Sequence, residues 1–496
     1  MRKFPLRLVS AIVMALASLA SLACAAAAQP FQHCPGAESA DFSEVLACYK
    51  KKQDSYPLNY HHVETQQLPG LEKRSFRLDS QDWSPRELVS PARWRHTVDI
   101  YIPGDAIKHR ALLVTNNGIS IPAPGKPSAP ATDFTEATLQ EIARESRTIV
   151  ISVSDVPNQY LTYSDDQVPR REDSSVAHSW QLFLKAPESN PFMTLHLPMA
   201  ATVVKAMDLA QAELKDWQID TFVATGTSKR AWAVWLAAIV DPRVNAIVPF
   251  VIDILNMDHV LEHTWRTYGK QWPMAFRDYH EQGITRQRHT SAFAQLRQIE
   301  DPLAYLDSAY AERLSIDKYI VNASGDDFFV PDNARFYLER LPAPTALRVA
   351  PNSSHYGISA FTEQTLITAL GRWQSDRPLP VVRIEQLTVA QKPMLDVKFS
   401  EAPSTVIQWT AHNPLARDFR HSCGIRYVSK PLQPGGEPLH LQVPLATPDS
   451  GWSATFVEAT FADGFVSTTP VFITPDSYPT VAPPVIEPAC KTLADH

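Results

Sequence analysis

The sequence predicts an α/β protein with a doubly wound, mostly parallel sheet, followed by a small all-β domain. Two observations predict this architecture. Up to about residue 377, apolar strand-like runs alternate with amphipathic helical patterns. Beyond that point helical periodicity stops, and short alternating runs are punctuated by Pro and Gly. A chain of 496 residues is long enough for two domains and a large core.

The first half of the predicted α/β domain, which we place at 76–377, starts with strands and continues with helices. Apolar or alternating runs predict strands at Arg74–Leu78, Thr97–Ile102, Ala111–Thr115 and Thr148–Val153. Amphipathic patterns predict helices at Phe134–Glu145, Glu172–Leu184 and Met199–Leu214.

The second half repeats this alternation around a long insertion. Strands are expected at Phe222–Thr225, Ala246–Val251, Tyr319–Ala323 and Ala346–Val349, and helices at Lys229–Ile239 and Asn333–Leu341. Between them lies a polar and aromatic insertion of about 253–315, which has helical content and no strand alternation. We expect this insertion to form a lid whose tryptophans line a pocket, although packing against the sheet is the more common role for any single one.

The sequence Arg377-Pro378-Leu379-Pro380 marks the boundary to a domain of immunoglobulin-like size at 378–478. Its expected strands are Val381–Leu387, Met394–Phe399, Thr405–Thr410, Leu439–Val443, Ser453–Ala459 and Val471–Ile473. Short alternating strands of this kind predict a β-sandwich. A Pro-rich tail at 479–496 follows it.

The N-terminus predicts export. Basic residues before an apolar run, and small residues before Gln29, are typical of a secretory signal peptide at 1–28. Cys24 fits a lipoprotein cleavage box only loosely, which argues against a lipid anchor. No other run is long enough for a transmembrane segment, so we expect a secreted or periplasmic protein. Residues 29–75 are polar and predict an irregular N-terminal arm.

Cysteine content and net charge indicate a disulfide-bonded protein and argue against zinc binding and nucleic-acid binding. Four cysteines remain after cleavage, Cys34, Cys48, Cys423 and Cys490. An even number in an oxidising compartment predicts two disulfides, most simply Cys34–Cys48 and Cys423–Cys490, with the other pairings left open. The spacing fits no zinc motif, and we expect no metal and no cofactor. A net charge of −7 without a long basic run argues against a nucleic-acid partner.

Ser228 is the strongest candidate for a catalytic residue. An apolar run ends in Gly226-Thr227-Ser228 and passes directly into a helical pattern, which is the context of a hydrolase nucleophile elbow. The following helix directs N–H groups towards this point and favours negative charge there. Arg230 stands where the second glycine of the motif belongs. The alternative is an ordinary turn with Ser228 as a helix N-cap.

A base and an acid follow in the α/β-hydrolase order. Asp326 and Asp327 come directly after a predicted strand, and His355 lies in a polar loop after the next one. Each could be ordinary loop chemistry alone, but their joint order predicts a Ser-His-Asp triad. Asp327 has the better spacing to Val330-Pro331, and both acids are kept as candidates.

An oxyanion hole needs two N–H donors. One is expected at the backbone of Lys229, and the other at Asn117 or Gly118, after the strand that ends at Thr115. A plain turn is the alternative for the second donor. His259 and His263, four residues apart, predict a solvated helix face rather than a metal pair.

Several of these segments resemble the PhoPQ-activated pathogenicity-related protein family. The matching segments are Gly226–Trp232, Asp241–Val244, Ile247–Pro249, Val156–Gln159, Arg171–Asp173, Leu197–Met199, Ala206–Asp208, Gly325–Phe329, Trp409, Asn413-Pro414, Arg417–Arg420, Gly451-Trp452 and Phe456–Glu458. The resemblance covers roughly Phe76 to Pro479. It implies an exported α/β-hydrolase-like protein with a link to virulence or resistance to host peptides. Ser-Lys-Arg is the family's own form of the elbow, and its Gly-Asp motif aligns with Asp326.

The sequence thus favours an exported serine hydrolase, an esterase or peptidase-like enzyme that acts on a small-molecule ester or peptide. The alternative is a non-catalytic binding or signalling protein on a hydrolase scaffold, because fold does not settle function. Substrate and oligomeric state are not encoded in any pattern that we recognise.

Overall fold

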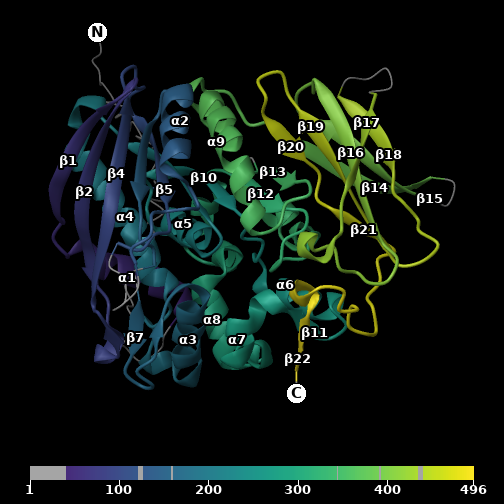
Figure 1. Ribbon diagram of the computed structural model, residues 1–496, viewed down its shortest axis with the longest axis horizontal. Helices are drawn as coiled ribbons and strands as arrows, with labels where there is room; N and C mark the ends of the chain where they lie inside the picture. Colours follow the sequence, from purple (N-terminus) through teal and green to yellow (C-terminus); the bar gives the residue numbers. More distant parts are fainter. Residues whose placement is uncertain are drawn as a thin grey trace, which may run out of the picture.

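The computed structural model describes residues 41–120, 127–157, 160–342, 345–389, 392–433 and 439–495. The expected signal peptide, Cys24 and Cys34 lie outside these residues. Figure 1 shows two parts side by side, an α/β body that carries the N-terminal half and a β-domain built from the C-terminal strands. None of the helices in the described ranges has the length and apolar character needed to cross a bilayer.

The α/β body is built on a mixed sheet, for which the described residues supply nine strands in the order β1-β2-β4-β6-β5-β9-β10-β12-β13. The strands are β1 (Asn59–Leu68), β2 (Leu71–Asp82), β4 (Arg93–Pro103), β5 (Arg110–Thr115), β6 (Ile149–Val153), β9 (Thr221–Thr227), β10 (Val244–Phe250), β12 (Asp317–Ala323) and β13 (Thr345–Ala350). β1, β2, β4 and β6 pair antiparallel, and every pair from β6 to β13 is parallel. The predicted mostly parallel sheet is confirmed.

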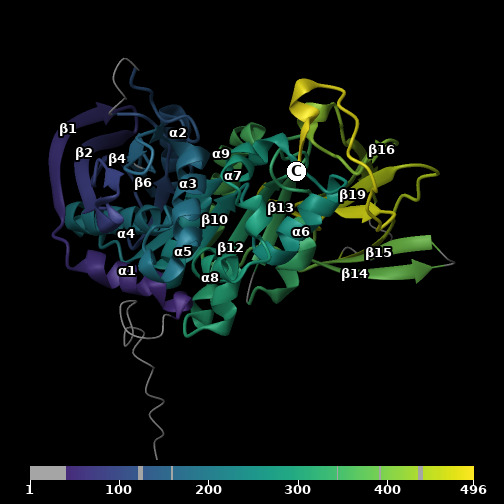
Figure 2. The same ribbon diagram turned by 90° about the horizontal axis from the view of Figure 1, so that it is seen from below.

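Helices cover both faces of this sheet (Figure 2). They are α1 (Val45–Asp54), α2 (Glu136–Ser146), α3 (Glu172–Lys185), α4 (His196–Glu213), α5 (Lys229–Val240) and α9 (Ser359–Gln374). Two consecutive residues of β5, whose side chains point to opposite faces of the sheet, show why helices are needed on both faces. Leu113 packs in the core formed with α4 and α5, whereas Leu112 packs in the core formed with α2 and α9. Strands apolar on both faces are typical of a doubly wound sheet.

The insertion between β10 and β12 is helical, as its sequence predicted. It contains α6 (Met257–Thr267), the short strand β11 (Gln271–Pro273), α7 (Arg277–Glu281), α8 (Ser291–Glu300) and several 3₁₀ turns. A small separate sheet joins β3 (Val89–Ser90), β7 (Leu161–Tyr163) and β8 (Pro169–Arg170).

Two antiparallel sheets form the C-terminal domain. One contains β14 (Val382–Val389), β15 (Lys392–Phe399) and β18 (His440–Pro444). The other contains β16 (Thr405–Asn413), β17 (Val428–Leu432), β19 (Trp452–Thr460), β20 (Val466–Thr468) and β21 (Phe472–Thr474). This domain shares a core with the α/β body, because Phe465 stacks on Tyr319 of β12 with ring centroids 4.5 Å apart.

The tail after Pro479 is held in place. Its end forms β22 (Thr492–Ala494), which pairs antiparallel with β11 of the insertion. Cys490 forms the expected disulfide with Cys423. The second expected pair, Cys34–Cys48, involves a residue outside the described ranges.

Two elements differ from the sequence prediction. The arm at 29–75 is not irregular where it is described, because it contains α1 and β1, and β2 begins there. β1 lies at the sheet edge with both faces largely exposed, so its sequence lacks the alternation by which a strand is recognised. The helix expected at Asn333–Leu341 is two 3₁₀ turns, Asn333–Phe336 and Leu338–Arg340. The Asn333 side chain there donates to the Asp253 carbonyl instead of facing solvent.

Candidate active site

Ser228 occupies a strained turn between β9 and α5. Its backbone has φ 54° and ψ −128°, a region that non-glycine residues rarely adopt and that costs about 1–3 kcal/mol. The Ser228 N–H donates to the Phe250 carbonyl at 2.8 Å, which ties the turn to β10. A Cβ atom at Gly226 would lie 2.9 Å from the Arg230 carbonyl carbon, so a glycine is needed where the helix meets the strand. The predicted nucleophile elbow therefore has the expected strand–turn–helix form.

Arg230, which replaces the second glycine of the usual motif, is buried and contacts two carboxylates and a backbone carbonyl. Its guanidinium contacts Glu172 at 2.7 Å and Asp133 at 3.1 Å, and it donates to the Val156 carbonyl at 2.5 Å. Only 4% of its side chain is exposed. Arg230 thus fastens the start of α5 to α3 and to the loop before α2.

Lys229 joins the same ionic cluster. Its ammonium lies 3.1 Å from both Glu172 and Asp173. Burial raises the pKa of Glu172, but the charges of Arg230 and Lys229 outweigh this and lower it from 4.5 to about 2. Burial likewise lowers the pKa of Lys229, whereas Asp173 and Glu172 raise it to about 12. Glu172 and Lys229 are therefore both charged at neutral pH.

Sequence reasoning missed the roles of Glu172, Asp173 and Asp133. Glu172 and Asp173 begin α3, and Asp133 lies between β5 and α2, far from Ser228 along the chain. Two signals were available. The Arg171–Asp173 segment belongs to the family resemblance, and a basic pair that opens an otherwise apolar helix requires acidic partners when it is buried.

His355 and Asp326 form a buried pair at the same edge of the sheet. His355 Nδ1 lies 3.0 Å from Asp326 Oδ1 and 2.9 Å from Oδ2. Both residues are almost fully buried, with 4% and 3% of their side chains exposed. Asp326 Oδ1 also accepts backbone N–H groups of Phe328 and Phe329, at 2.8 and 3.2 Å. These bonds fix the carboxylate and direct it at His355.

Asp327, the other candidate acid, does not contact His355. Its Oδ1 accepts a hydrogen bond of 2.6 Å from Ser422 Oγ in the C-terminal domain. Adjacent residues in a turn direct their side chains to different sides, and here Asp326 faces the histidine. Asp326 is therefore the partner of His355 in the structure. The family motif indicated Asp326, whereas the spacing to Val330-Pro331 favoured Asp327.

A further buried carboxyl, Asp253, follows β10 near this pair. Burial raises its pKa from 3.8 to about 8; the hydrogen bond with Tyr337 opposes the shift, and the charge of Asp326 adds to it. Asp253 is therefore protonated at neutral pH. In that form it does not compete with Asp326 for the positive charge of an imidazolium at His355.

The expected oxyanion donors lie after β5 and at the start of α5. Lys229 is the first residue of α5, where a backbone N–H has no partner within the helix. The Asn117 N–H is already donated to the Asn116 side chain at 3.0 Å, and its carboxamide contacts Thr132. Gly118 has φ +128°, a conformation suited to glycine. Because the Asn117 N–H is engaged, Gly118 remains the candidate for the second donor.

A narrow apolar cavity opens at Ser228. Its volume is about 50 Å³. Aromatic side chains dominate its wall: Trp180, Trp232, Trp272, Phe276, Phe328 and Phe329. Trp272 and Phe276 come from the insertion, so this segment contributes to the cavity wall, whereas Trp265, the other tryptophan of the insertion, is not among the lining residues. Phe328 also packs on His355, with ring centroids 4.6 Å apart, and so connects the cavity to the His355–Asp326 pair.

Elsewhere, histidines serve structural contacts. His263 is not on a solvated face as expected, because its Nε2 lies 2.9 Å from buried Asp332 and its Nδ1 lies 2.7 Å from the Tyr478 hydroxyl. In the described ranges, Asp165, Asp166 and His178 are close enough together to hold a metal ion. Arg170 already pairs with Asp166, at 2.5 Å.

A comparison with known protein families gives the same family that the sequence motifs resemble. The PhoPQ-activated pathogenicity-related protein family matches residues 46–420. The chain belongs to this family. The match includes Ser228, Asp326 and His355, and it extends into the C-terminal domain as far as the Arg417–Arg420 segment.

One protein of similar sequence is named for a role other than hydrolysis, and solved structures of hydrolases have a similar fold. Autocrine proliferation repressor protein A of Dictyostelium discoideum is 30% identical over 420 residues, which cover 77% of this chain and 79% of that protein. Acetyl xylan esterase 1 of Thermoanaerobacterium is 16% identical with a TM-score of 0.41, over 68% of this chain and 94% of the esterase. A peroxisomal α/β-hydrolase of Saccharomyces cerevisiae is 14% identical with a TM-score of 0.32, over 68% and 93% of the two chains.

Proposed function

We propose that this member of the family is an exported serine hydrolase that cleaves small esters or peptide-like acyl substrates. The single observation that carries the proposal is the strained backbone of Ser228, φ 54° and ψ −128°, at the sheet edge where His355 pairs with Asp326. Backbone strain of this kind clusters at active sites. An ordinary helix N-cap needs no left-handed conformation.

In this proposal Ser228 is the nucleophile and His355 the general base. The Ser228 hydroxyl attacks the acyl carbon while His355 Nε2 takes its proton, and His355 later returns a proton to the leaving group. Asp326 accepts from His355 Nδ1–H, which sets the tautomer and stabilises the imidazolium. The backbone N–H groups of Lys229 and Gly118 stabilise the oxyanion. Water then hydrolyses the acyl-enzyme.

The cavity indicates the size of the acyl group. A volume of about 50 Å³ accommodates about four water-sized groups, or an acyl chain of about two to four carbons. Its aromatic wall favours an apolar chain over a charged one. Trp272, from the insertion, forms part of this wall, so chains too long for the cavity require the insertion to move.

Activity-based labelling tests this proposal. The mature protein is treated with a fluorophosphonate probe beside Ser228→Ala and His355→Ala, and hydrolysis of p-nitrophenyl esters from acetate to octanoate is measured. We expect labelling of the wild type alone and the highest kcat/KM for the shortest esters. No labelling of a folded, disulfide-bonded sample would refute the proposal.

The alternative is a binding or signalling protein on the same scaffold. It is favoured by the name of the Dictyostelium relative, which describes repression of proliferation rather than a reaction. Under this alternative, Ser228→Ala leaves the biological effect intact. The labelling experiment therefore separates the two, because a reactive serine has no part in pure binding.

A further inference from the structure

The loop between β16 and β17, residues 414–427, packs against the α/β body although it is rich in charge. Arg417, Asp418 and Arg420 are 1%, 3% and 2% exposed. Burying three charged side chains in one loop is costly unless each is paired. Arg420 pairs with Asp418 at 2.6 Å within the loop, and Arg417 pairs with Asp332 of the α/β body at 2.7 Å. The next residues of the loop contact both neighbours of Asp326.

Two contacts from this loop flank Asp326. The His421 N–H donates to the Gly325 carbonyl at 2.9 Å, and the Ser422 hydroxyl donates to Asp327 Oδ1 at 2.6 Å. A Cβ atom at Gly325 would lie 2.7 Å from the His421 nitrogen, so glycine permits this close approach. The residues on both sides of Asp326 are therefore held by the C-terminal domain.

A third contact holds the far end of the same turn. The Arg417 guanidinium pairs with Asp332 at 2.7 Å and donates to Thr267 Oγ1 of α6 at 2.9 Å. Burial raises the pKa of Asp332, but the charges of Arg417 and His263 outweigh it and hold the pKa far below its usual range. The turn that carries Asp326 is thus fastened at residues 325, 327 and 332.

The loop that carries His355 is held from the same side. Asn352 donates to the Tyr427 carbonyl at 2.9 Å and accepts the Tyr427 N–H at 2.7 Å. Asn352 has φ 54°, a left-handed conformation that these two bonds stabilise. The Gly325 N–H donates to the Ser353 carbonyl at 2.9 Å, so the acid and histidine loops also contact each other.

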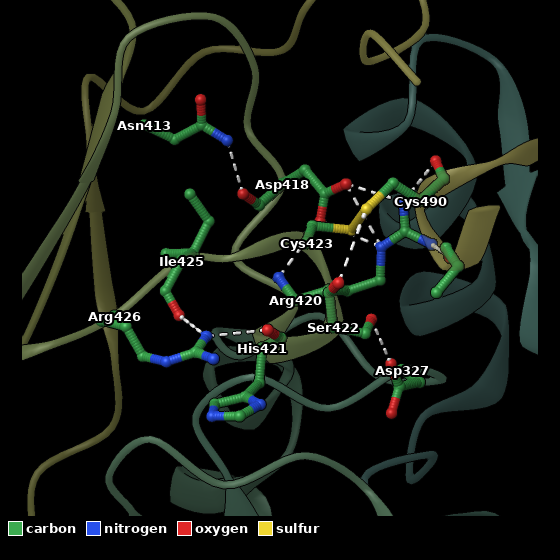
Figure 3. Close-up of a disulfide and its surroundings, with 11 residues drawn as sticks. Asp327, Asn413, Asp418, Arg420, His421, Ser422, Cys423, Ile425, Arg426 and Cys490 are labelled. Carbon is green, nitrogen blue, oxygen red and sulfur yellow. Dashed lines mark hydrogen bonds and ion pairs between the residues drawn. A yellow bond between two sulfur atoms is a disulfide. The ribbon is translucent and has the colours of Figure 1, made fainter. Parts of the chain in front are cut away.

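The β16–β17 loop is itself fixed by the C-terminal tail (Figure 3). Cys423 forms the disulfide with Cys490, and the Arg420 guanidinium donates to the carbonyls of Ala489 and Cys490 at 3.1 and 3.0 Å. Figure 3 shows Ser422, beside this disulfide, directed at Asp327. The tail continues into β22, which pairs with β11 of the insertion.

We propose that the β16–β17 loop is a positioning element of the active site. Through Ser422 and Tyr427 it holds Asp326 and His355 in the relative position that proton transfer requires. The C-terminal domain therefore completes the hydrolase site instead of forming only a separate binding module. This inference rests on the proposed serine-hydrolase function.

Small side-chain changes at two contacts of the loop, Ser422 with Asp327 and Tyr427 with Asn352, test the inference. Ser422→Ala removes the hydroxyl that donates a hydrogen bond to Asp327, and Ser422→Thr retains a hydroxyl. Ser429→Ala, which changes an exposed serine on β17, is the matched control. Asn352→Gly removes both bonds to Tyr427 and keeps the positive φ accessible. Each variant is compared with the wild type by rate of fluorophosphonate labelling, kcat and KM for p-nitrophenyl acetate, and thermal unfolding.

We expect Ser422→Ala to lower the labelling rate and kcat about tenfold. The double variant Ser422→Ala, Asn352→Gly should lower them about 100-fold, because a displacement of catalytic groups by about 1 Å has effects of this size. KM should change by less than about threefold, since the cavity is untouched. Ser422→Thr should restore the rate, and Ser429→Ala should match the wild type. If folded Ser422→Ala and the double variant both label at the wild-type rate, the inference is wrong.

A proton NMR measurement separates this inference from the proposed function. The proton between His355 Nδ1 and Asp326 should give a low-field resonance whether or not the enzyme turns over a substrate. If the wild type fails to label, the hydrolase proposal fails, and the resonance alone decides the positioning role. Loss or broadening of the resonance in the Ser422→Ala, Asn352→Gly double variant supports that role, and an unchanged resonance overturns it.

Discussion

Replacement of Asp326 by asparagine is expected to damage the site severely for a reason visible in its hydrogen bonds. Asp326 Oδ1 accepts the Phe328 and Phe329 N–H groups. In Asp326→Asn the carbonyl oxygen must keep that position, because an NH₂ group cannot accept these bonds. The NH₂ then takes the place of Oδ2, which lies 2.9 Å from His355 Nδ1.

A donor at that position favours the wrong tautomer of His355. When the imidazole accepts from this NH₂ group, Nδ1 presents a lone pair and the proton sits on Nε2, where it cannot take the Ser228 proton. The retained oxygen also lies 3.0 Å from Nδ1, but a neutral amide oxygen is a weaker partner for an imidazolium than the carboxylate. The comparable change in serine proteases lowers kcat by about 10⁴, equivalent to about 5 kcal/mol of transition-state stabilisation. We expect a loss of this order with little change in thermal stability.

The neighbouring residue provides a matched control. In Asp327→Asn the amide oxygen can still accept the Ser422 hydroxyl, and no contact to His355 is affected. We expect its labelling rate and kcat/KM for p-nitrophenyl acetate to stay within about threefold of the wild type. A greater loss in Asp327→Asn than in Asp326→Asn would refute the assignment of the acid.

Three further predictions concern stability and specificity. Arg230→Gly restores the usual elbow motif and removes the guanidinium that Glu172 and Asp133 contact in the buried cluster, although Glu172 keeps Lys229. It should destabilise the protein by about 3–5 kcal/mol; this is a decrease of about 5–8 °C in Tm for an α/β domain of roughly 300 residues, and an unchanged Tm would contradict it. Because the folded-state pKa of Glu172 is lowered from 4.5 to about 2, its contribution of about 3 kcal/mol is present above pH 4.5 and is lost as the pH falls towards 2. Urea unfolding between pH 6 and 3 should show this loss, and Glu172→Gln should reduce it. Leu261 of α6 also lines the cavity. Leu261→Ala enlarges the cavity and should move the preferred p-nitrophenyl ester by about two carbons, at a cost of about 2–5 kcal/mol in stability; an unchanged preference would separate this cavity from the acyl site.

Much of the site could be predicted from the sequence because it depends on local signals. A buried strand followed by Gly-x-Ser and a helical pattern describes β9, the Ser228 turn and α5 within about 20 residues. Asp326 and His355 follow the next strands in the order that a parallel sheet requires, so their carboxyl-end position follows from topology. The insertion was recognisable by its aromatic helical character.

The elements that were missed depend on long-range contacts. The sequence predicts an irregular arm where β1 lies, since this outer strand at the sheet edge has no buried face to impose alternation. The helix expected at Asn333–Leu341 gave way to 3₁₀ turns held by tertiary hydrogen bonds. His263 was assigned to solvent, but Asp332 and Tyr478, 69 and 215 residues away, bury it.

The sequence by itself determined the order of strands and helices, the place of the serine, acid and histidine along it, and the division into an α/β and a β domain. These follow from hydrophobic periodicity, which records burial residue by residue. Only the tertiary structure decided that Asp326 and not Asp327 faces His355, that Arg230 is paired, and that the β16–β17 loop contacts both catalytic loops. Those choices rest on hydrogen bonds and ion pairs between residues up to about a hundred positions apart, whose energies no local pattern contains.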